Sequence, residues 1–266
     1  MDVNRVLYIS QEITPYLAAS PISKFSKELP ESILGRGCEV RTFMPRYGII
    51  NERRNQLHEV IRLSGLNIVI DDTDHPLIIK VATLQPSRMQ VYFIDNDDYF
   101  LRHSASGLET ETHFSENDER AIFFVRGVLE TVKKLRWAPS VIHCTGWITA
   151  LAALYLKKTY ADDPTFANTK IVYSLFDAPF EGNLDERFGE KLVMDGFTNE
   201  DIAALEGSAN FNALNRLAMA HADAIAISSE NICGELIEYA RSTGKPLLEY
   251  PGDGGHEAYR DFYLSL

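Results

Sequence analysis

Short apolar runs alternate with longer apolar runs of helical period over most of this chain. Strands are predicted at residues 6–9 and 40–44, with a helix between them at residues 22–34 that contains Pro30 and ends near Gly35. The alternation returns later, with predicted strands at residues 141–143, 171–174 and 224–227 and predicted helices at residues 115–135, 147–160, 211–220 and 232–239. Strands that alternate with helices are typical of a mostly parallel sheet covered by helices, so we expect an α/β fold.

The pattern changes in two places. Residues 57–100 contain short apolar runs and an acidic turn at residues 71–74 but no long helical period, which predicts an antiparallel β insertion with strands at residues 60–63, 66–70, 77–81 and 91–94. Residues 257–266 place Tyr259, Phe262 and Tyr263 at helical spacing, and we expect this tail to fold back onto the sheet as a helix. No repeat divides the chain, so residues 1–266 are interpreted as one domain with an insertion at 57–100 and a tail at 245–266.

Composition and charge narrow the function. The chain has 266 residues, of which 45% are hydrophobic and 24% charged, as in an ordinary globular domain. Its net charge of -12 argues against a nucleic-acid partner and against docking on an anionic membrane, because both need a basic surface. No apolar run reaches the ~18 residues needed to span a bilayer.

The cysteines and the N-terminus indicate the compartment. Cys38, Cys144 and Cys233 are odd in number and widely spaced, which fits a reducing cytosol better than a disulfide framework. The first ten residues, MDVNRVLYIS, lack the cationic leader and long apolar stretch of a signal peptide. We therefore predict a cytoplasmic protein.

Candidate ligand contacts lie where predicted strands end, because ligands of open parallel sheets bind at the carboxyl ends of the strands. His143 ends one strand and Trp147 opens the next helix, while Tyr16 and Phe176 lie in neighbouring loops, and their aromatic faces suit sugar rings. The alternative for the histidine is a hydrogen-bonded structural group, and for Trp147 it is core packing. The loop at residues 15–21 has no glycine, which disfavours a phosphate cradle.

A metal site is the weaker chemistry in this sequence. Asp95 and Asp97 follow a predicted strand and could hold a hard cation, but a solvated turn is the favoured interpretation because Asp and Asn dominate turns. The seven histidines show no HExxH or paired spacing. Neither a metal nor a cofactor is predicted.

Several segments together resemble the N-terminal half of the glycogen and starch synthases, two-domain enzymes that extend an α-1,4-glucan from ADP-glucose. The matching stretches run in family order over most of residues 3 to 240. They are VLYIS at 6–10, EITPY at 12–16, RGCEVR at 36–41, MPRYG at 44–48, NDER at 117–120, His143 with Trp147, and AD at 222–223. The resemblance implies a single Rossmann-like domain of the glycosyltransferase-B N-terminal type.

The family's functional motifs are largely replaced. Its Lys-Thr-Gly-Gly loop, which receives the nucleotide sugar, falls on residues 18–21, which read Ala-Ala-Ser-Pro. Of its His-x-His-Asp-Trp-His motif, this sequence keeps only His143 and Trp147. Ile148 stands at the position of the final, active-site histidine. Its His-Asn pair falls on Phe176 and Asp177. We expect Tyr16, Trp147, Phe176 and Asp177 as substrate contacts and His143 as the one candidate catalytic residue.

Two functions stay open. The resemblance implies a glycogen or starch synthase domain, inactive alone or dependent on a separate chain that supplies the nucleotide-binding C-terminal half, which we expect this sequence to lack. The alternative is a non-catalytic regulator of glycogen metabolism that binds glucan or protein. The candidate ligands are an α-glucan and ADP-glucose, and a metal-dependent enzyme using Asp95 and Asp97 is a third, weaker reading.

Overall fold

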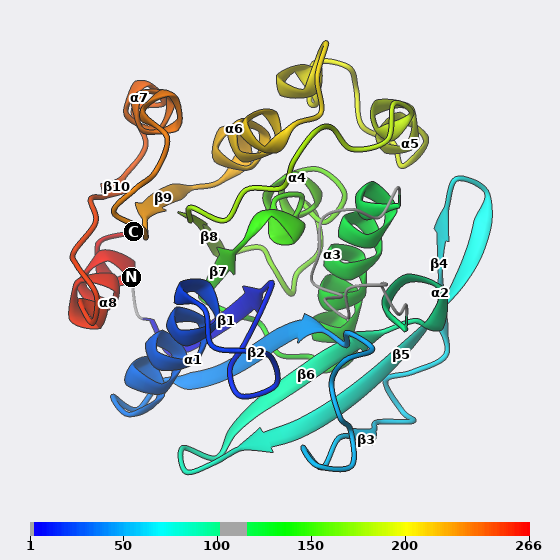
Figure 1. Cartoon of the computed structure of the whole chain (residues 1–266), viewed down its shortest axis with the longest axis vertical. Helices are drawn as coiled ribbons and strands as arrows, with labels where there is room; N and C mark the ends of the chain where they lie inside the picture. The colour runs from blue at the N-terminus through cyan, green and yellow to red at the C-terminus, as the bar shows by residue number, and fades with distance from the viewer. Residues whose placement is uncertain (1–2, 102–115) are drawn as a thin grey trace.

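The computed structural model describes residues 3–101 and 116–266, and its described residues form one mixed sheet flanked by helices (Figure 1). The strands in chain order are β1 Arg5–Ser10, β2 Glu39–Pro45, β3 His58–Glu59, β4 Leu66–Ile70, β5 Thr73–Leu84, β6 Met89–Asp95, β7 Val141–Thr145, β8 Lys170–Leu175, β9 Ala224–Ile227 and β10 Leu247–Leu248. The helices are α1 Pro21–Leu34, α2 Asp97–Phe100, α3 Asn117–Lys134, α4 Ala152–Lys157, α5 Phe188–Met194, α6 Phe211–His221, α7 Gly234–Ser242 and α8 His256–Ser265, with short 3-10 turns η1 Trp147–Thr149 and η2 Ala203–Leu205.

The sheet has the order β10-β9-β8-β7-β1-β2-β6-β5-β3, and β4 pairs with β5. All pairs from β10 to β6 are parallel, whereas β3, β4 and β6 pair antiparallel with β5. This arrangement confirms the predicted mostly parallel α/β fold with an antiparallel insertion. The connection reverses direction between β1 and β7, so the topological switch point lies where these two strands end.

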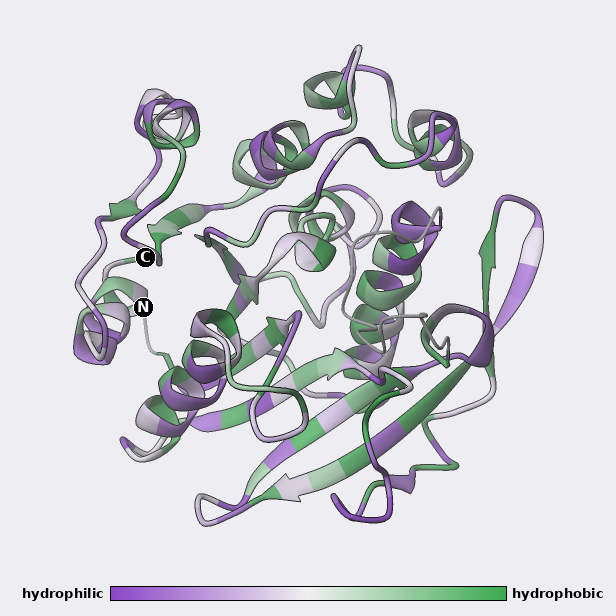
Figure 2. Cartoon of the chain, viewed as in Figure 1, coloured by the Kyte–Doolittle hydropathy of each residue, from purple (hydrophilic) through white to green (hydrophobic). Residues whose placement is uncertain are grey.

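Alternating side chains of the central strands supply two cores. Leu7 and Ile9 of β1 pack with apolar residues of α3, α4 and α6 on one face. Val6 and Tyr8 point to the other face, where they pack under α1 and α8. This division follows from the period of two along a strand. In Figure 2, β1 and β9 are mainly hydrophobic, whereas the tip of the β4–β5 hairpin is hydrophilic.

The tail forms the predicted helix. Helix α8 buries Tyr259 and Tyr263, which lie four residues apart on one face and are 2% and 1% exposed. It lies beside α1 and packs into the second core (Figure 1). Arg36, just beyond α1, forms an ion pair with Glu257 of α8. The prediction that this tail folds back onto the sheet as a helix is confirmed.

Some local predictions were wrong. Residues 60–63 form a turn rather than a strand, because only Leu63 of that run is fully buried while Ile61 is 82% exposed. The predicted helix at residues 147–160 is a 3-10 turn followed by the shorter α4. Helix α3 has Glu116 at its N-cap with no side-chain cap bond, and Ser115, where the predicted helix begins, lies outside the described residues.

Helices α2 and α5 were not predicted. None of the helices in the described parts of the chain is long and apolar enough to cross a membrane.

Candidate functional site

The switch point of the sheet is filled by protein side chains. Gly146 follows β7 with φ +94°, and a Cβ there would lie 2.5 Å from Cβ of Gln11, which follows β1. Gln11 is 5% exposed and donates from Nε2 to Glu12, while its backbone carbonyl accepts from the Tyr47 hydroxyl at 3.1 Å. A residue with a side chain could occupy position 146 only if Gln11 moved, so the turn at the end of β7 requires glycine.

His143 lies inside the sheet rather than at its edge. The sequence predicted that His143 ends its strand and faces the crevice, but β7 continues to Thr145 and His143 is 0% exposed under α8. Its Nε2 lies 2.6 Å from Oγ of Ser174 and its Nδ1 lies 2.6 Å from the hydroxyl of Tyr263. Burial lowers the pKa of His143 to about 3, so the ring is neutral at physiological pH.

A chain of hydroxyl groups fixes this imidazole. Tyr259 donates to Ser228 at 2.9 Å, and Ser228 donates to Ser174 at 2.9 Å. Ser174 can therefore direct its own proton to Nε2 of His143, which leaves the Nδ1 proton for Tyr263. A neutral imidazole with both nitrogens engaged and no access to solvent is a structural group, so the structure favours the structural interpretation of His143.

The predicted aromatic platforms divide into two groups. Tyr16 is 7% exposed and packs edge-on against Phe93 at 4.9 Å, and Trp147 is 3% exposed and packs edge-on against Phe180 at 5.2 Å. These two rings have almost no free face to offer to a sugar. Phe176 is also buried, at 6% exposed, but it lies at the edge of the sheet beside the exposed Asp177.

Phe176 and Asp177 line a cleft of about 460 Å³ at the carboxyl ends of the parallel strands. Residues 19–28 at the start of α1 form one wall, and the loops after β8 and β9 form the edge of the sheet. The tail, from Tyr250 to Tyr259, forms the opposite wall. Phe25 contacts both Phe176 and Tyr259, with ring centroids 5.0 Å and 5.2 Å apart, and so joins the walls.

Carboxylates dominate the charge of this cleft. Its lining includes four of them, on Glu28, Asp177, Glu230 and Asp253, against one lysine, Lys24, and one histidine, His256. Of these, His256 lies with its Nε2 4.0 Å from the Glu28 carboxylate. Asp253 accepts a hydrogen bond from the Tyr250 hydroxyl at 2.6 Å. An excess of negative charge opposes anionic ligands and leaves many oxygen acceptors for hydroxyl donors.

The N-terminus of α1, which would face a phosphate, is already satisfied. The Ser20 hydroxyl caps the helix by accepting a hydrogen bond from the Ser23 backbone N–H. The Ser23 hydroxyl in turn accepts one from the Ser20 backbone N–H. The Ser20 hydroxyl also donates to the Glu12 carboxylate at 2.9 Å. A carboxylate therefore takes the favourable position at the positive end of this helix.

The acidic motif at residues 95–98 is not a metal site. Asp95 is 1% exposed and lies 2.8 Å from Nζ of Lys80 and 3.3 Å from Nε of Arg46, so both the metal interpretation and the solvated-turn interpretation of Asp95 were wrong. Asp97 is exposed in the first turn of α2. Among the described residues no group of three His, Cys, Asp or Glu side chains could hold a metal ion.

The sequence missed the residues that complete both the network and the cleft. Ser174 and Ser228 come from neighbouring strand ends, and Tyr259 and Tyr263 come from the tail. The spacing of the two tyrosines on a predicted helix was the one available signal. Their partners, 31 and 120 residues away, become visible only in the folded chain.

Comparisons with known proteins agree with one another. The model of the starch synthase catalytic domain matches residues 5–249. The glycogen synthase of Chlorobium chlorochromatii is 38% identical over 193 residues, covering 72% of this chain and 40% of that protein. The glycogen synthase of Pelodictyon phaeoclathratiforme is 34% identical over 253 residues, covering 92% and 50%.

The fold has a solved counterpart. The catalytic domain of starch synthase IV from Arabidopsis thaliana, bound to ADP and acarbose, superposes with a TM-score of 0.74 at 17% identity, covering 94% of this chain and 51% of that one. This likeness supports the glycosyltransferase-B fold. The chain spans about half the length of the curated relatives it matches.

Proposed function

The chain belongs to the glycogen and starch synthase family, and from that premise we propose that it binds an α-glucan at the tail-walled cleft without transferring glucose by itself. The observation that carries this proposal is the composition of the cleft, with four carboxylates and one lysine around the aromatic rings of Phe25 and Phe176. A neutral polyhydroxyl ligand satisfies such acceptors, whereas a nucleoside diphosphate would bring two further negative charges to them.

The residues with which the family motifs receive the nucleotide sugar are replaced in this chain. Residues 18–21 supply no lysine and no glycine, and the end of α1 is occupied by Ser20 and the Glu12 carboxylate. Ile148 stands where the family has its active-site histidine, and it is 0% exposed. Losing one group that stabilises developing charge commonly costs about 3 kcal/mol of transition-state stabilisation, and several such groups are replaced.

One wall of the cleft is formed by residues beyond the part of the chain that the family model matches. The family match ends at residue 249, and the tail residues from Tyr250 to Tyr259 that wall the cleft lie beyond it. Of the four predicted substrate contacts we retain Phe176 and Asp177, because they line this cleft. Asp177 is exposed, and its backbone N–H donates to Oγ of Ser229, another residue of the cleft lining.

Calorimetry with maltoheptaose and with ADP-glucose tests the proposal. We expect maltoheptaose to bind and ADP-glucose not to bind, and we expect no release of ADP on glycogen by this chain alone. Asp177→Asn should weaken maltoheptaose binding several-fold, whereas Asp74→Asn, an exposed aspartate of the β4–β5 hairpin, should leave it unchanged.

The outcomes separate the possibilities. ADP-glucose binding with turnover would refute the non-catalytic proposal, and the absence of maltoheptaose binding would refute the glucan proposal. A second reaction adds the C-terminal half of a related glycogen synthase as a separate chain. Turnover that appears only in that mixture would show that the domain depends on a partner chain.

A further inference from the structure

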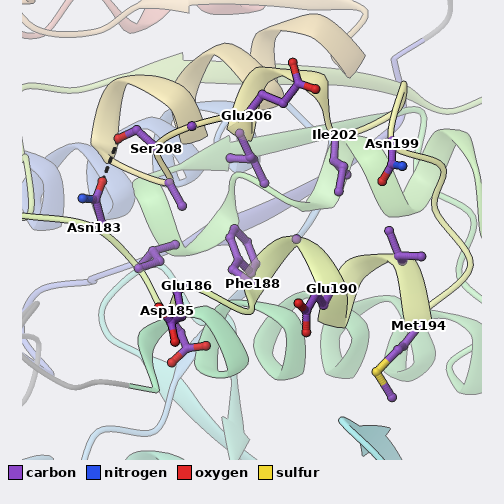
Figure 3. Close-up of a pocket in the computed structure, with 16 residues that line it drawn as sticks. Asn183, Asp185, Glu186, Phe188, Glu190, Met194, Asn199, Ile202, Glu206 and Ser208 are labelled. Carbon is purple, nitrogen blue, oxygen red and sulfur yellow. Dashed lines mark hydrogen bonds between the residues drawn. The ribbon is translucent and has the colours of Figure 1, made fainter.

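A second concavity lies far along the chain from the cleft, between α5 and the segment around η2. It has a volume of about 890 Å³, nearly twice that of the cleft. In Figure 3, α5 forms one wall with Glu190, and the opposite wall carries Ile202 and Glu206. Ser208 donates to Asn183 at 2.7 Å across one end of this concavity, which we call the groove.

The floor of this groove is apolar. Phe188 is 0% exposed, and Leu184, Ile202 and Leu205 are each less than a tenth exposed. Val193 and Met194, at the end of α5, also line the groove and are 43% and 50% exposed. A groove whose apolar floor continues into exposed apolar side chains is suited to an apolar partner surface.

The rims of the groove are acidic. Asp185, Glu186, Glu190 and Glu206 belong to the lining, and none of the described lining residues is basic. The nearby cations are directed elsewhere. Arg187 forms a bidentate pair with Asp71 of the β4–β5 hairpin, at 2.7 and 2.8 Å, and reaches Glu190 at 3.3 Å.

Lys191 is committed to buried carboxylates. It lies 2.8 Å from Asp118 and 2.7 Å from Glu119 and only reaches Asp185 at 3.6 Å. Glu186 and Glu206 are exposed, and no ion pair of the described residues involves either. These two carboxylates present uncompensated charge on opposite sides of the apolar floor.

From this arrangement we propose that the groove binds a basic amphipathic segment of a partner protein. Apolar side chains of the segment would cover the floor and Val193, while Arg or Lys side chains on its two flanks would pair with Glu186 and Glu206. This is the helix-in-groove mode of peptide recognition. A nucleotide or an anionic lipid would meet only repulsion here, and a second copy of this chain carries the same net charge of -12. The segment therefore belongs to a different, basic partner, and its binding is independent of the glucan cleft.

The test uses the whole chain and three synthetic peptides. The first has a Leu stripe flanked by Arg on both sides, the second replaces each Arg with Glu, and the third scrambles the first. Fluorescence anisotropy should show the Arg peptide binding the wild type, with little binding of the Glu peptide and weaker binding of the scrambled one. Binding should weaken as salt is raised, because exposed charges supply part of it.

Two variants locate the site. Glu186→Gln with Glu206→Gln should weaken the Arg peptide roughly tenfold. The control, Glu59→Gln with Glu238→Gln, removes two exposed carboxylates outside the groove and should leave the affinity unchanged. Val193→Ser, at a position that is 43% exposed, should weaken binding several-fold without changing its salt dependence, and its melting temperature is measured alongside.

Equal loss in the groove variant and the control would overturn the proposal, because binding would then follow overall charge. Equal binding of the Arg and scrambled peptides, or no binding of the Arg peptide at millimolar concentration, would also overturn it. Maltoheptaose titrations of the same variants keep the two sites apart, since the groove substitutions should leave glucan binding unchanged.

Discussion

Replacing His143 with glutamine should remove a large pH dependence from the folding free energy. In the folded chain this imidazole is surrounded by Tyr8 of β1, Phe25 of α1 and the two tyrosines of α8, none of which carries charge. Burial raises the pKa of Tyr8 and Tyr263, so these neighbours stay neutral as the pH falls. None of these described neighbours carries a negative charge that would offset the burial of an imidazolium.

The magnitude follows from the difference in pKa between the two states. The pKa of His143 is about 3 in the folded chain, against an ordinary value of about 6.5 when unfolded. Below about pH 6.5 the unfolded state takes up the proton first, so the free energy of unfolding falls as the pH falls towards 3. Well below pH 6.5 the slope approaches 1.4 kcal/mol per pH unit, so between pH 7.5 and 5.0 the contribution lost is about 2 kcal/mol.

Urea denaturation at a series of pH values measures this effect. The difference in unfolding free energy between the wild type and His143→Gln should shrink by about 2 kcal/mol between pH 7.5 and 5.0, because the variant lacks the titrating group. His58→Gln, at an exposed position of β3, is the matched control and should keep the wild-type slope. Parallel pH profiles for the wild type and His143→Gln would refute the assignment of His143 as a buried neutral group.

Three further substitutions test other contacts, each by thermal or urea unfolding. Gly146→Ala should destabilise by about 1–3 kcal/mol more than Gly37→Ala, because both have positive φ but only the Cβ at 146 has a close neighbour; equal effects would contradict this. Tyr263→Phe should lower the free energy of unfolding by about 1–3 kcal/mol, because it leaves a buried ring nitrogen of His143 unpaired. No change would show that this hydrogen bond does not stabilise the packing of α8. Lys191→Met should cost about 3–5 kcal/mol by leaving the buried Asp118 unpaired, and an unchanged midpoint would show that this carboxyl is protonated.

The sequence predicted the sheet well because its central strands are buried on both faces. Such strands form continuous apolar runs, as at Val6 to Ile9, and each run is followed by a helical period. The sequence-based predictions failed where an element is buried on one face only, or where residues distant in the sequence cover it. Residues 60–63 have the composition of a strand, yet Ile61 has no surface to cover it. Helix α5 is only seven residues long. Its Lys191 donates hydrogen bonds to carboxylates more than seventy residues away in the sequence.

The candidate site was predictable in outline only. The positions of Phe176 and Asp177 at the edge of the sheet followed from the rule for parallel strands, and both line the cleft. His143 was misplaced because the polar His143 itself interrupts the apolar run after Ile142, whereas β7 continues to Thr145. The other wall of the cleft is made by a tail about 75 residues further along than Phe176, and no local pattern encodes such a contact.

The tail connects the cleft with the interior of the sheet. Tyr259 lines the cleft and also donates to Ser228, the first step of the hydroxyl chain that ends at His143. Because a ligand that binds only the folded state stabilises it by about 2.7 kcal/mol at one hundred times its dissociation constant, glucan binding at this cleft should be visible as increased stability of α8.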